Sequence, residues 1–313
     1  GVCWAIAVQA TQQPRAERPE WRKYSAAMAN SAPIKSLSLG GASWNTMVYV
    51  DQFPEPQPGT VFTKGYHETV GSSGAGKALN MRRLGADATL FALLGEDDHA
   101  ARIREFIESR GITLIAGTDP AGTVRHVNLM NPEGDRISLF ANAGSYELEV
   151  DVEPVLPAMR RADIVSVTIL NYCRQFLPLL RDLGKKIAVD IHDYDGANPH
   201  HIEFIEAADF LFMSSLKLQE WRGFLEKRVA SGTTIAVCTH GSAGASGLTA
   251  ATGWTDIPAV QVARVVDTNG AGDAFYAGFM TSWFNNGDME HAMKSGAETA
   301  AAAVQSPDLA PLQ

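Results

Sequence analysis

The chain has 313 residues, 45% of them hydrophobic, so it can bury a sizeable core as one large α/β domain or as one domain with an appendage. Its formal net charge of −9 argues against nucleic acid or an anionic membrane as a partner. Three scattered cysteines show no CxxC spacing, which leaves neither a disulfide framework nor a zinc site to propose.

The first 33 residues differ from the rest of the chain. Residues 1–10 are mildly apolar but lack a basic n-region, and residues 11–23 are polar with charges of both signs. This pattern is a poor match to a signal peptide, and no apolar run approaches the ~18 residues that a bilayer requires. We therefore expect residues 1–33 to be a poorly ordered extension and the protein to be cytoplasmic.

From residue 34 onward, short β-rich runs alternate with helical patterns, beginning with a buried strand at residues 88–94 and a helix that stops at Gly111. Further strands are expected at residues 112–116, 164–170, 187–191, 210–213 and 234–239, and helices at 175–183, 201–208 and 216–226. This alternation predicts an α/β fold over residues 34–313, with a doubly wound, mostly parallel central sheet and helices on both faces. Ligands of such sheets bind at the carboxyl ends of the strands.

Two segments interrupt this alternation. Residues 46–70 show strand-like alternation around a Pro-rich stretch, and residues 122–140 form a hairpin pattern around the turn sequence Asn131-Pro132-Glu133-Gly134. Together they predict a small separate β-sheet. Such a sheet is either surface decoration or a lid that closes over substrate and excludes water.

A glycine cluster occupies residues 71–80. Gly71, Gly76 and Lys77 fit a phosphate-binding P-loop, but Ala78 stands where a Ser or Thr hydroxyl would hold magnesium. The preceding residues 63–70 are not the buried apolar strand that a P-loop follows. A P-loop is therefore the less favoured interpretation of this cluster.

Polar residues follow two of the predicted strands. Asp190 and Asp193, near His192, could hold Mg²⁺ through waters, although a solvated acidic loop explains the same residues equally well. Residues 239–244 follow the strand at 234–239, and hydroxyls and exposed N–H groups in such a turn can bind nucleotide phosphates. A plain β-turn would also explain this second pattern.

The most informative segment is Asp267-Thr268-Asn269-Gly270-Ala271-Gly272-Asp273-Ala274-Phe275. A small-residue turn leads into an apolar helix, whose first N–H groups form an anion site. An aspartate beside a bound phosphate makes sense if Asp273 removes a proton from a hydroxyl that attacks this phosphate. The simpler alternative is an acidic residue that complements the helix dipole.

This segment resembles the D-T-x-G-A-G-D-A-F signature of the ribokinase, or PfkB-type, carbohydrate kinase family, and the resemblance covers about residues 34–304. It implies a ribokinase-like fold in which the segments 46–70 and 122–140 form the lid. It also implies an ATP-dependent kinase that phosphorylates a hydroxymethyl group of a small sugar or sugar-like substrate. Asp273 would be the general base, and the turn of Gly270, Ala271 and Gly272 the anion hole.

The resemblance also assigns the sugar site. Gly76, Lys77 and Asn80 match the family's G-G-K/x-x-x-N motif, which implies contacts with substrate hydroxyls. Asn45 stands where the family has an aspartate that binds two sugar hydroxyls. An amide carries no charge, so sugar hydroxyls would bind more weakly or the site would select a different substrate. A predicted lid strand that could also determine substrate selectivity carries Arg125, His126 and Asn128. Side chains alternate along a strand, and the sequence does not show which of these three face inward.

On the nucleotide side, Thr239, Gly241, Ser242 and Gly244 resemble the family's T-x-G-x-x-G turn. The family's N-x-x-E motif, which helps to order magnesium and phosphate, is missing because Ser214 and Lys217 occupy its positions. Mg²⁺ would then be held by Asp190 and Asp193 or by the phosphates of ATP itself. Asp267 is the candidate for a monovalent cation such as K⁺.

Two other functions stay open at this point. The same fold is used by nucleoside kinases, and the lost N-x-x-E motif together with Asn45 is compatible with a non-catalytic sugar- or nucleotide-binding regulator. The resemblance also implies a homodimer that pairs through the lid sheets.

Overall fold

The computed structural model describes residues 32–132 and 134–311, and residues 34–313 form one unit by themselves. The prediction of a poorly ordered extension at residues 1–33 falls almost wholly outside the described residues. Within the described ranges, no helix combines the length and the apolar character needed to cross a membrane.

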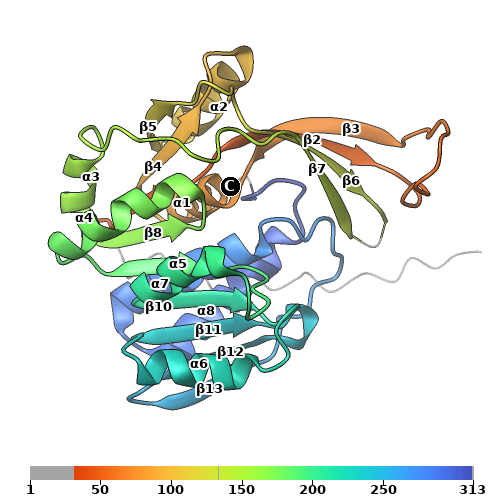
Figure 1. Cartoon of the computed structure of the whole chain (residues 1–313). Helices are drawn as coiled ribbons and strands as arrows, with labels where there is room; N and C mark the ends of the chain where they lie inside the picture. The colour runs from red at the N-terminus through yellow and green to blue at the C-terminus, as the bar shows by residue number, and fades with distance from the viewer. Residues whose placement is uncertain (1–31, 133, 312–313) are drawn as a thin grey trace, which may run out of the picture. The chain divides into compact units, whose positions relative to one another are not determined.

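The central sheet has nine strands, and seven of them pair in parallel (Figure 1). Their order across the sheet is β13 (Gly253–Ile257), β12 (Ala245–Thr249), β11 (Ile235–Thr239), β10 (Phe210–Ser214), β9 (Ile187–Asp190), β8 (Ile164–Thr168), β1 (Lys35–Leu39), β4 (Asp87–Leu94) and β5 (Thr113–Thr118). Strands β12 and β13 continue the sheet in antiparallel orientation. The predicted mostly parallel sheet is confirmed, and the antiparallel edge was not predicted.

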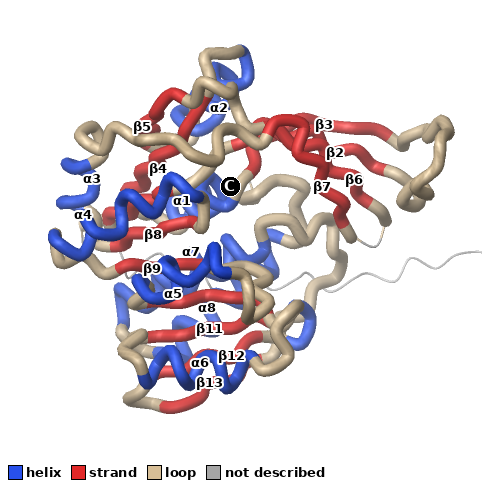
Figure 2. Tube along the Cα trace, in the orientation of Figure 1, coloured by secondary structure: helices blue, strands red, loops and turns tan. Residues whose placement is uncertain are grey.

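Helices cover both faces of this sheet, as Figure 2 shows. They are α1 (Ser73–Arg83), α2 (Asp98–Glu108), α3 (Leu156–Arg161), α4 (Phe176–Asp182), α5 (Ile202–Ala207), α6 (Trp221–Ala230), α7 (Ala271–Asn286) and α8 (Met289–Ala303), with 3₁₀ turns η3 (Asn171–Gln175), η4 (Pro199–His201) and η5 (Gly241–Ala243). Alternate residues of one strand serve opposite faces. Leu211 of β10 packs in the core beneath α3–α6, whereas Phe210 and Phe212 pack with α7 and α8.

The predicted lid is a separate sheet of four strands in the order β3 (Gly65–Gly71), β2 (Ser43–Tyr49), β6 (Arg125–Met130) and β7 (Arg136–Asn142). Figure 1 shows this sheet as its own layer beside the central sheet. The β6–β7 pair is antiparallel around the predicted Asn131–Gly134 turn, and the Pro-rich stretch separates β2 from β3. The expected small sheet is thus confirmed, with strands that extend the predicted segments by a few residues.

Candidate active site

The turn before α7 has the geometry that an anion site requires. Gly270 caps the helix with a φ of 78°, a left-handed conformation that glycine adopts without strain. The first N–H groups of a helix have no intrahelical acceptor, and α7 begins at Ala271. A Cβ placed on Gly272 would meet no atom within 4 Å. The space beside Gly272 is therefore open, whereas the N–H of Ala271 donates to the carbonyl of Thr268 at 3.3 Å.

The glycine cluster at residues 71–80 is the end of β3 followed by α1, so the P-loop reading is wrong. Gly74, Gly76 and Lys77 lie inside a helix that starts at Ser73. Glycines are needed there because the helix packs closely on its neighbours. A Cβ on Gly74 would lie 2.6 Å from the carbonyl carbon of Gly40, and one on Gly76 would lie 2.4 Å from Oδ2 of Asp273.

This close packing brings α1 against the first turn of α7. Asp273 is 8% exposed, and its Oδ1 accepts hydrogen bonds from the Ser73 hydroxyl and the Lys77 ammonium, each at 2.5 Å. Ser73 and Lys77 lie one helical turn apart, and Lys77 also donates to the Ser73 hydroxyl at 2.7 Å. Sequence reasoning missed Ser73, and its i, i+4 spacing from Lys77 would have revealed it once residues 73–83 were predicted as a helix.

Lys77 is the centre of a buried charge cluster. Its Nζ lies 3.1 Å from Oδ2 of Asp190, at the end of β9, as well as 2.5 Å from Asp273. Burial by itself lowers the pKa of Lys77, but Asp273 and Asp190 more than offset this effect and raise it above the usual value. Burial raises the pKa of Asp190, but His192 and Lys77 outweigh it and lower this pKa to about 2.

The predicted magnesium site at Asp190 and Asp193 stays a prediction. The Asp190 carboxylate is engaged by Lys77 and by the backbone N–H of His192 at 2.9 Å, whereas Asp193 is exposed. The described residues contain no group of three or more His, Cys, Asp or Glu side chains that could hold a metal ion. An ammonium ion beside Asp190 is also unfavourable for a second cation. Any Mg²⁺ held here would therefore need ligands from waters or from the phosphates of a nucleotide as well.

The two asparagines that were predicted to bind the sugar, Asn45 and Asn80, are buried. Asn45 is 3% exposed, and its Oδ1 accepts from the Ser43 hydroxyl at 2.8 Å. Asn80 is fully buried, and its amide donates to the carbonyls of Gly76 and Leu309, each at 2.9 Å. Its Oδ1 has no hydrogen-bond partner among the described residues. Asn80 thus links α1 to the carboxyl-terminal segment, and its contact with a sugar stays a prediction.

The predicted nucleotide turn lies at the carboxyl end of β11. Gly241 and Gly244 have φ values of 57° and 103°, and the N–H of His240 donates to the carbonyl of Gly244 at 2.8 Å. Gly241 and Ser242 are exposed, while Thr239 is half-buried and accepts through its carbonyl from the N–H of Ser215. The turn therefore presents small residues and a hydroxyl to solvent at the same edge of the sheet as Asp190.

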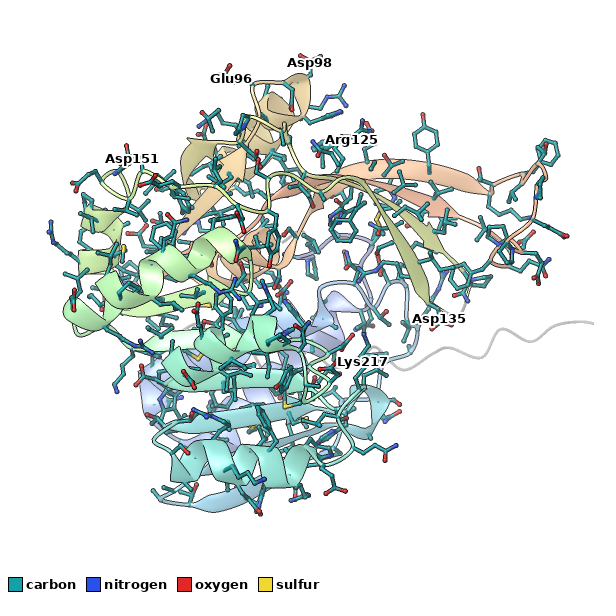
Figure 3. The ribbon with its side chains drawn as sticks, in the orientation of Figure 1. Glu96, Asp98, Arg125, Asp135, Asp151 and Lys217 are labelled. Atoms are coloured by element: carbon teal, nitrogen blue, oxygen red, sulfur yellow. The ribbon has the colours of Figure 1, made fainter. Side chains whose placement is uncertain are left out.

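The neighbouring loop after β10 carries the residues that replace the N-x-x-E motif. Lys217, labelled in Figure 3, is exposed on this loop, and the Ser214 hydroxyl accepts from the N–H of Leu216 at 3.2 Å. The loop thus offers an ammonium group where the family's motif has a carboxylate.

The lid touches the turn before α7. The Thr268 hydroxyl donates to the carbonyl of Gly134 at 3.0 Å, and the Arg136 guanidinium donates to Oδ1 of Asn269. Asp267 is 2% exposed and accepts from the N–H of Asn269 at 2.7 Å; burial raises the pKa of its carboxyl. The β6–β7 hairpin therefore rests on the segment that supplies the candidate anion hole.

The strand register decides which lid residues face this segment. His126 and Asn128 pair across the sheet with Asn45 and Met47, so they share the face of Asn45, whereas Arg125 points to the other face. The Asn128 amide oxygen accepts from the Ser138 hydroxyl at 2.7 Å, and the rings of His126 and Phe140 lie 4.1 Å apart. Phe140, which pairs with His126 across the sheet, is 64% exposed.

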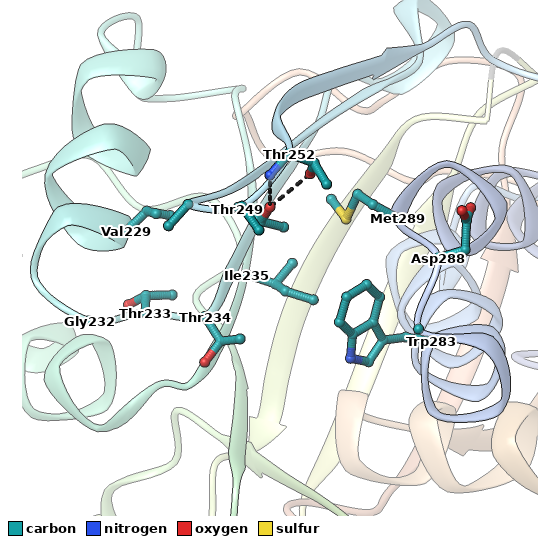
Figure 4. Close-up of a pocket in the computed structure, with 13 residues that line it drawn as sticks. Val229, Gly232, Thr233, Thr234, Ile235, Thr249, Thr252, Trp283, Asp288 and Met289 are labelled. Carbon is teal, nitrogen blue, oxygen red and sulfur yellow. Dashed lines mark hydrogen bonds between the residues drawn. The ribbon is translucent and has the colours of Figure 1, made fainter.

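The described residues form two pockets, one at each edge of the central sheet. A polar pocket of about 510 Å³ is formed by the loops after β7, β8 and β9, and its lining residues are Tyr146, Glu147, Asn171, Arg174, Asn198, Pro199, His200 and Glu203. A second pocket, of about 500 Å³ and largely apolar, lies around Ile235 and Trp283 (Figure 4). Because Ile235 begins β11 and the predicted nucleotide turn follows its end, this second pocket lies at the opposite edge of the sheet from the candidate site.

Comparison with known proteins identifies relatives over most of the chain. Residues 42–312 match the model of the pfkB family carbohydrate kinases. The chain is 31% identical to the acarbose 7(IV)-phosphotransferase of an Actinoplanes species, over 83% of this chain and 89% of that protein. It is also similar to the solved structure of the microbiome-derived acarbose kinase Mak1, with 29% identity, coverage of 87% and 93%, and a TM-score of 0.80.

The fold has a further counterpart at lower identity. Arabidopsis thaliana ribokinase, solved with ribose and ATP, is 20% identical, with coverage of 89% and 95% and a TM-score of 0.76. This likeness shows the ribokinase-like fold that the sequence predicted. Together with the family match over residues 42–312, it means that the chain belongs to the pfkB family of carbohydrate kinases.

Proposed function

We propose that this carbohydrate kinase is an ATP-dependent phosphotransferase whose acceptor is a hydroxymethyl group of a sugar or sugar-like molecule. The acceptor oxygen bonds to the γ-phosphorus of ATP while the bond to ADP breaks, and the hydroxyl proton passes to Asp273. The observation that carries this proposal is the buried Asp273 carboxylate beside the open first turn of α7. There the amides of Gly272 and Asp273 stabilise the charge of the transferred phosphoryl group.

The acceptor that we test first is acarbose or a similar oligosaccharide. Two relatives are named for acarbose, and the polar pocket of about 510 Å³ lies on the loops that follow β7, β8 and β9, the last of which ends at Asp190. A pocket of that size can hold rings beyond the one that is phosphorylated. The experiment is a coupled assay of ADP release with acarbose, ribose, fructose and adenosine as acceptors. Turnover with adenosine alone would favour the nucleoside kinase, and ADP release with none would oppose the proposal.

We place ATP over the turn of Thr239, Gly241, Ser242 and Gly244. The described residues contain no group of three or more His, Cys, Asp or Glu side chains that could hold a metal ion, so we derive no step through a protein-bound metal. In this proposal Mg²⁺ arrives with the phosphates of ATP. The exposed Lys217 is suited to the same phosphates. Asp267 is the proposed carboxylate for K⁺, and equal turnover in potassium and tetramethylammonium chloride would contradict that role.

Gly272→Ala tests the anion hole. A Cβ at this position meets no protein atom within 4 Å, so we expect a folded enzyme of unchanged or slightly higher stability. The methyl group would instead occupy the space of the phosphoryl group. We expect kcat to fall by about 10²-fold, the usual cost of a lost oxyanion contact. Steady-state kinetics and thermal unfolding measure the two effects.

Gly223→Ala is the matched control for this prediction. Gly223 is also helical, in α6, and a Cβ there also meets nothing within 4 Å. This variant should keep the wild-type kcat. If Gly272→Ala were as active as Gly223→Ala, the space beside Gly272 would not be the phosphoryl site.

We also propose that the protein dimerises through the lid. The interface is the face of this sheet opposite to Asn45, which we call the outer face. Paired positions of the register place Tyr66, Val48, Leu129 and Ile137 in one row of this face and Leu139 in the next. Tyr66, Leu139 and Ile137 are 72%, 51% and 39% exposed. A second copy that covers this apolar face removes it from water, which is favourable.

Leu139→Lys tests the dimer. Burying the charge of a lysine in an apolar interface is unfavourable because the ammonium group loses its water. We therefore expect the variant to sediment as a monomer where the wild type sediments as a dimer. Leu216→Lys makes the same change at a leucine that is 75% exposed on the loop after β10, and it should leave the mass unchanged. A wild-type monomer at micromolar concentration, or a dimeric Leu139→Lys variant, would refute the lid interface.

A further inference from the structure

The two oxygens of the Asp273 carboxylate lie in different surroundings. Oδ1 accepts from the Ser73 hydroxyl and the Lys77 ammonium, each at 2.5 Å. No donor among the described residues contacts Oδ2, which instead lies over Gly76, where a Cβ would come within 2.4 Å. One oxygen is thus fully occupied by protein donors, and the other is kept free by a missing side chain.

Lys77 is itself held rigidly. Its side chain is 2% exposed and is fixed from the other side by Asp190, whose Oδ2 is 3.1 Å away. The ring of Tyr276 lies 5.1 Å from Nζ, and the Tyr276 hydroxyl bonds to the Ser166 hydroxyl at 2.5 Å. Such a buried pair is costly to form and to move, because each charge relies on its partner for the solvation it has lost.

The hydrogen bonds of Lys77 leave none for a sugar. An ammonium group has three N–H donors. The three acceptors around Nζ are Oδ1 of Asp273, Oδ2 of Asp190 and the Ser73 hydroxyl. The role of sugar ligand that the sequence suggested for Lys77 therefore conflicts with the contacts it makes.

A carboxylate without such donors would turn readily, because the terminal torsion of Asp is broad and nearly two-fold. Either oxygen would then face the acceptor, and the reacting geometry would be lost for part of the time. Two short hydrogen bonds to the same oxygen remove this freedom.

We propose that Lys77, anchored by Asp190, is a positioning residue that acts with Ser73 to hold Oδ1 of Asp273, so that Oδ2 is the atom that takes the proton of the acceptor hydroxyl. This inference rests on the proposed role of Asp273 as general base. It assigns Asp190 a part in the reaction as the counter-charge of Lys77, in place of a metal ligand.

Lys77→Met tests the proposal, because methionine keeps much of the length of the side chain and removes its charge and donors. We expect kcat to fall by about 10²-fold, the scale that a misplacement of about 1 Å costs. The KM values for acceptor and ATP should stay at their wild-type levels, since Lys77 contacts neither. A raised KM for the acceptor with an unchanged kcat would instead identify Lys77 as a sugar ligand and overturn the proposal.

A second variant guards against misfolding. Lys77→Met leaves Asp190 buried without its partner, so the double variant Lys77→Met/Asp190→Asn restores the charge balance. We expect it to unfold at a higher temperature than Lys77→Met and to keep the low kcat. Recovery of kcat in the double variant would show that Lys77 serves only stability. Lys186→Met removes the lysine of an exposed pair with Asp209 and should behave as the wild type.

The outcomes separate this inference from the proposed function. If Asp273→Asn is inactive and Lys77→Met is fully active, Asp273 remains the base and the positioning role is wrong. If Asp273→Asn is itself active, the proposed function fails first. Ethylammonium ions added to Lys77→Ala supply a further check, because partial recovery of kcat by a free amine is expected only if the ammonium itself is required.

Discussion

Asp273→Asn is expected to abolish phosphoryl transfer, with kcat lowered by at least about 10²–10⁴-fold, while ATP still binds. An amide has nearly the shape of the carboxylate but cannot take the proton of the acceptor hydroxyl. The proposed nucleotide turn at Thr239–Gly244 is a separate segment at the end of β11, so we expect ATP binding there to be unaffected. Single-turnover kinetics and calorimetric titration with ATP measure the two properties separately.

Asp288→Asn is the matched control for this variant. Asp288 caps the neighbouring helix α8, and its side chain accepts from the N–H of His291 at 2.6 Å. Asparagine caps a helix about as well as aspartate, so this variant should retain wild-type kcat. Substantial turnover by Asp273→Asn, at the level of Asp288→Asn, would remove Asp273 from the mechanism.

Gly76→Ala is the second substitution with a large expected effect. A Cβ at this position would lie 2.4 Å from Oδ2 of Asp273 and 3.0 Å from its Cγ, so the carboxylate must move. A misplacement of about 1 Å can lower the rate by about 10²-fold. Alanine also favours a helix over glycine by about 1 kcal/mol, which offsets part of the strain in α1. We therefore expect a folded protein with a greatly reduced kcat.

Thermal unfolding and steady-state kinetics on the same preparation test this prediction. A large fall in kcat with little change in unfolding temperature would support it, and Gly223→Ala again serves as the helical glycine without a close neighbour. Wild-type kcat in Gly76→Ala would mean that Asp273 does not need its observed position, which would count against both the base and its positioning.

The fold was predictable because hydrophobic periodicity reports local structure. Strands such as β4 and β10 were located within about two residues, which is the usual uncertainty of such boundaries. Helix α1 was not predicted, since Gly74 and Gly76 are poor helix formers and tertiary packing overrides that preference. The antiparallel strands β12 and β13 were missed as well, because neither five-residue strand alternates between buried and exposed positions.

The motif that carries family membership was also readable, because it is contiguous. Residues 267–275 supply the turn, the helix start and the carboxylate in one stretch, and the family match confirms the resemblance. Contacts between residues far apart along the chain could not be predicted from the sequence in this way. Lys77 and Asp190 are separated by 113 positions, and each was interpreted alone, as a sugar ligand and as a metal ligand.

The amino-acid sequence by itself determined the α/β architecture, the small separate sheet and the family, since periodicity and a continuous motif are properties of neighbouring residues. Only the tertiary structure decided how the charges are shared among α1, β9 and α7. A buried ammonium satisfies whichever carboxylates the packing of helices and strands brings within hydrogen-bonding distance, and that packing is set by contacts between residues far apart along the chain.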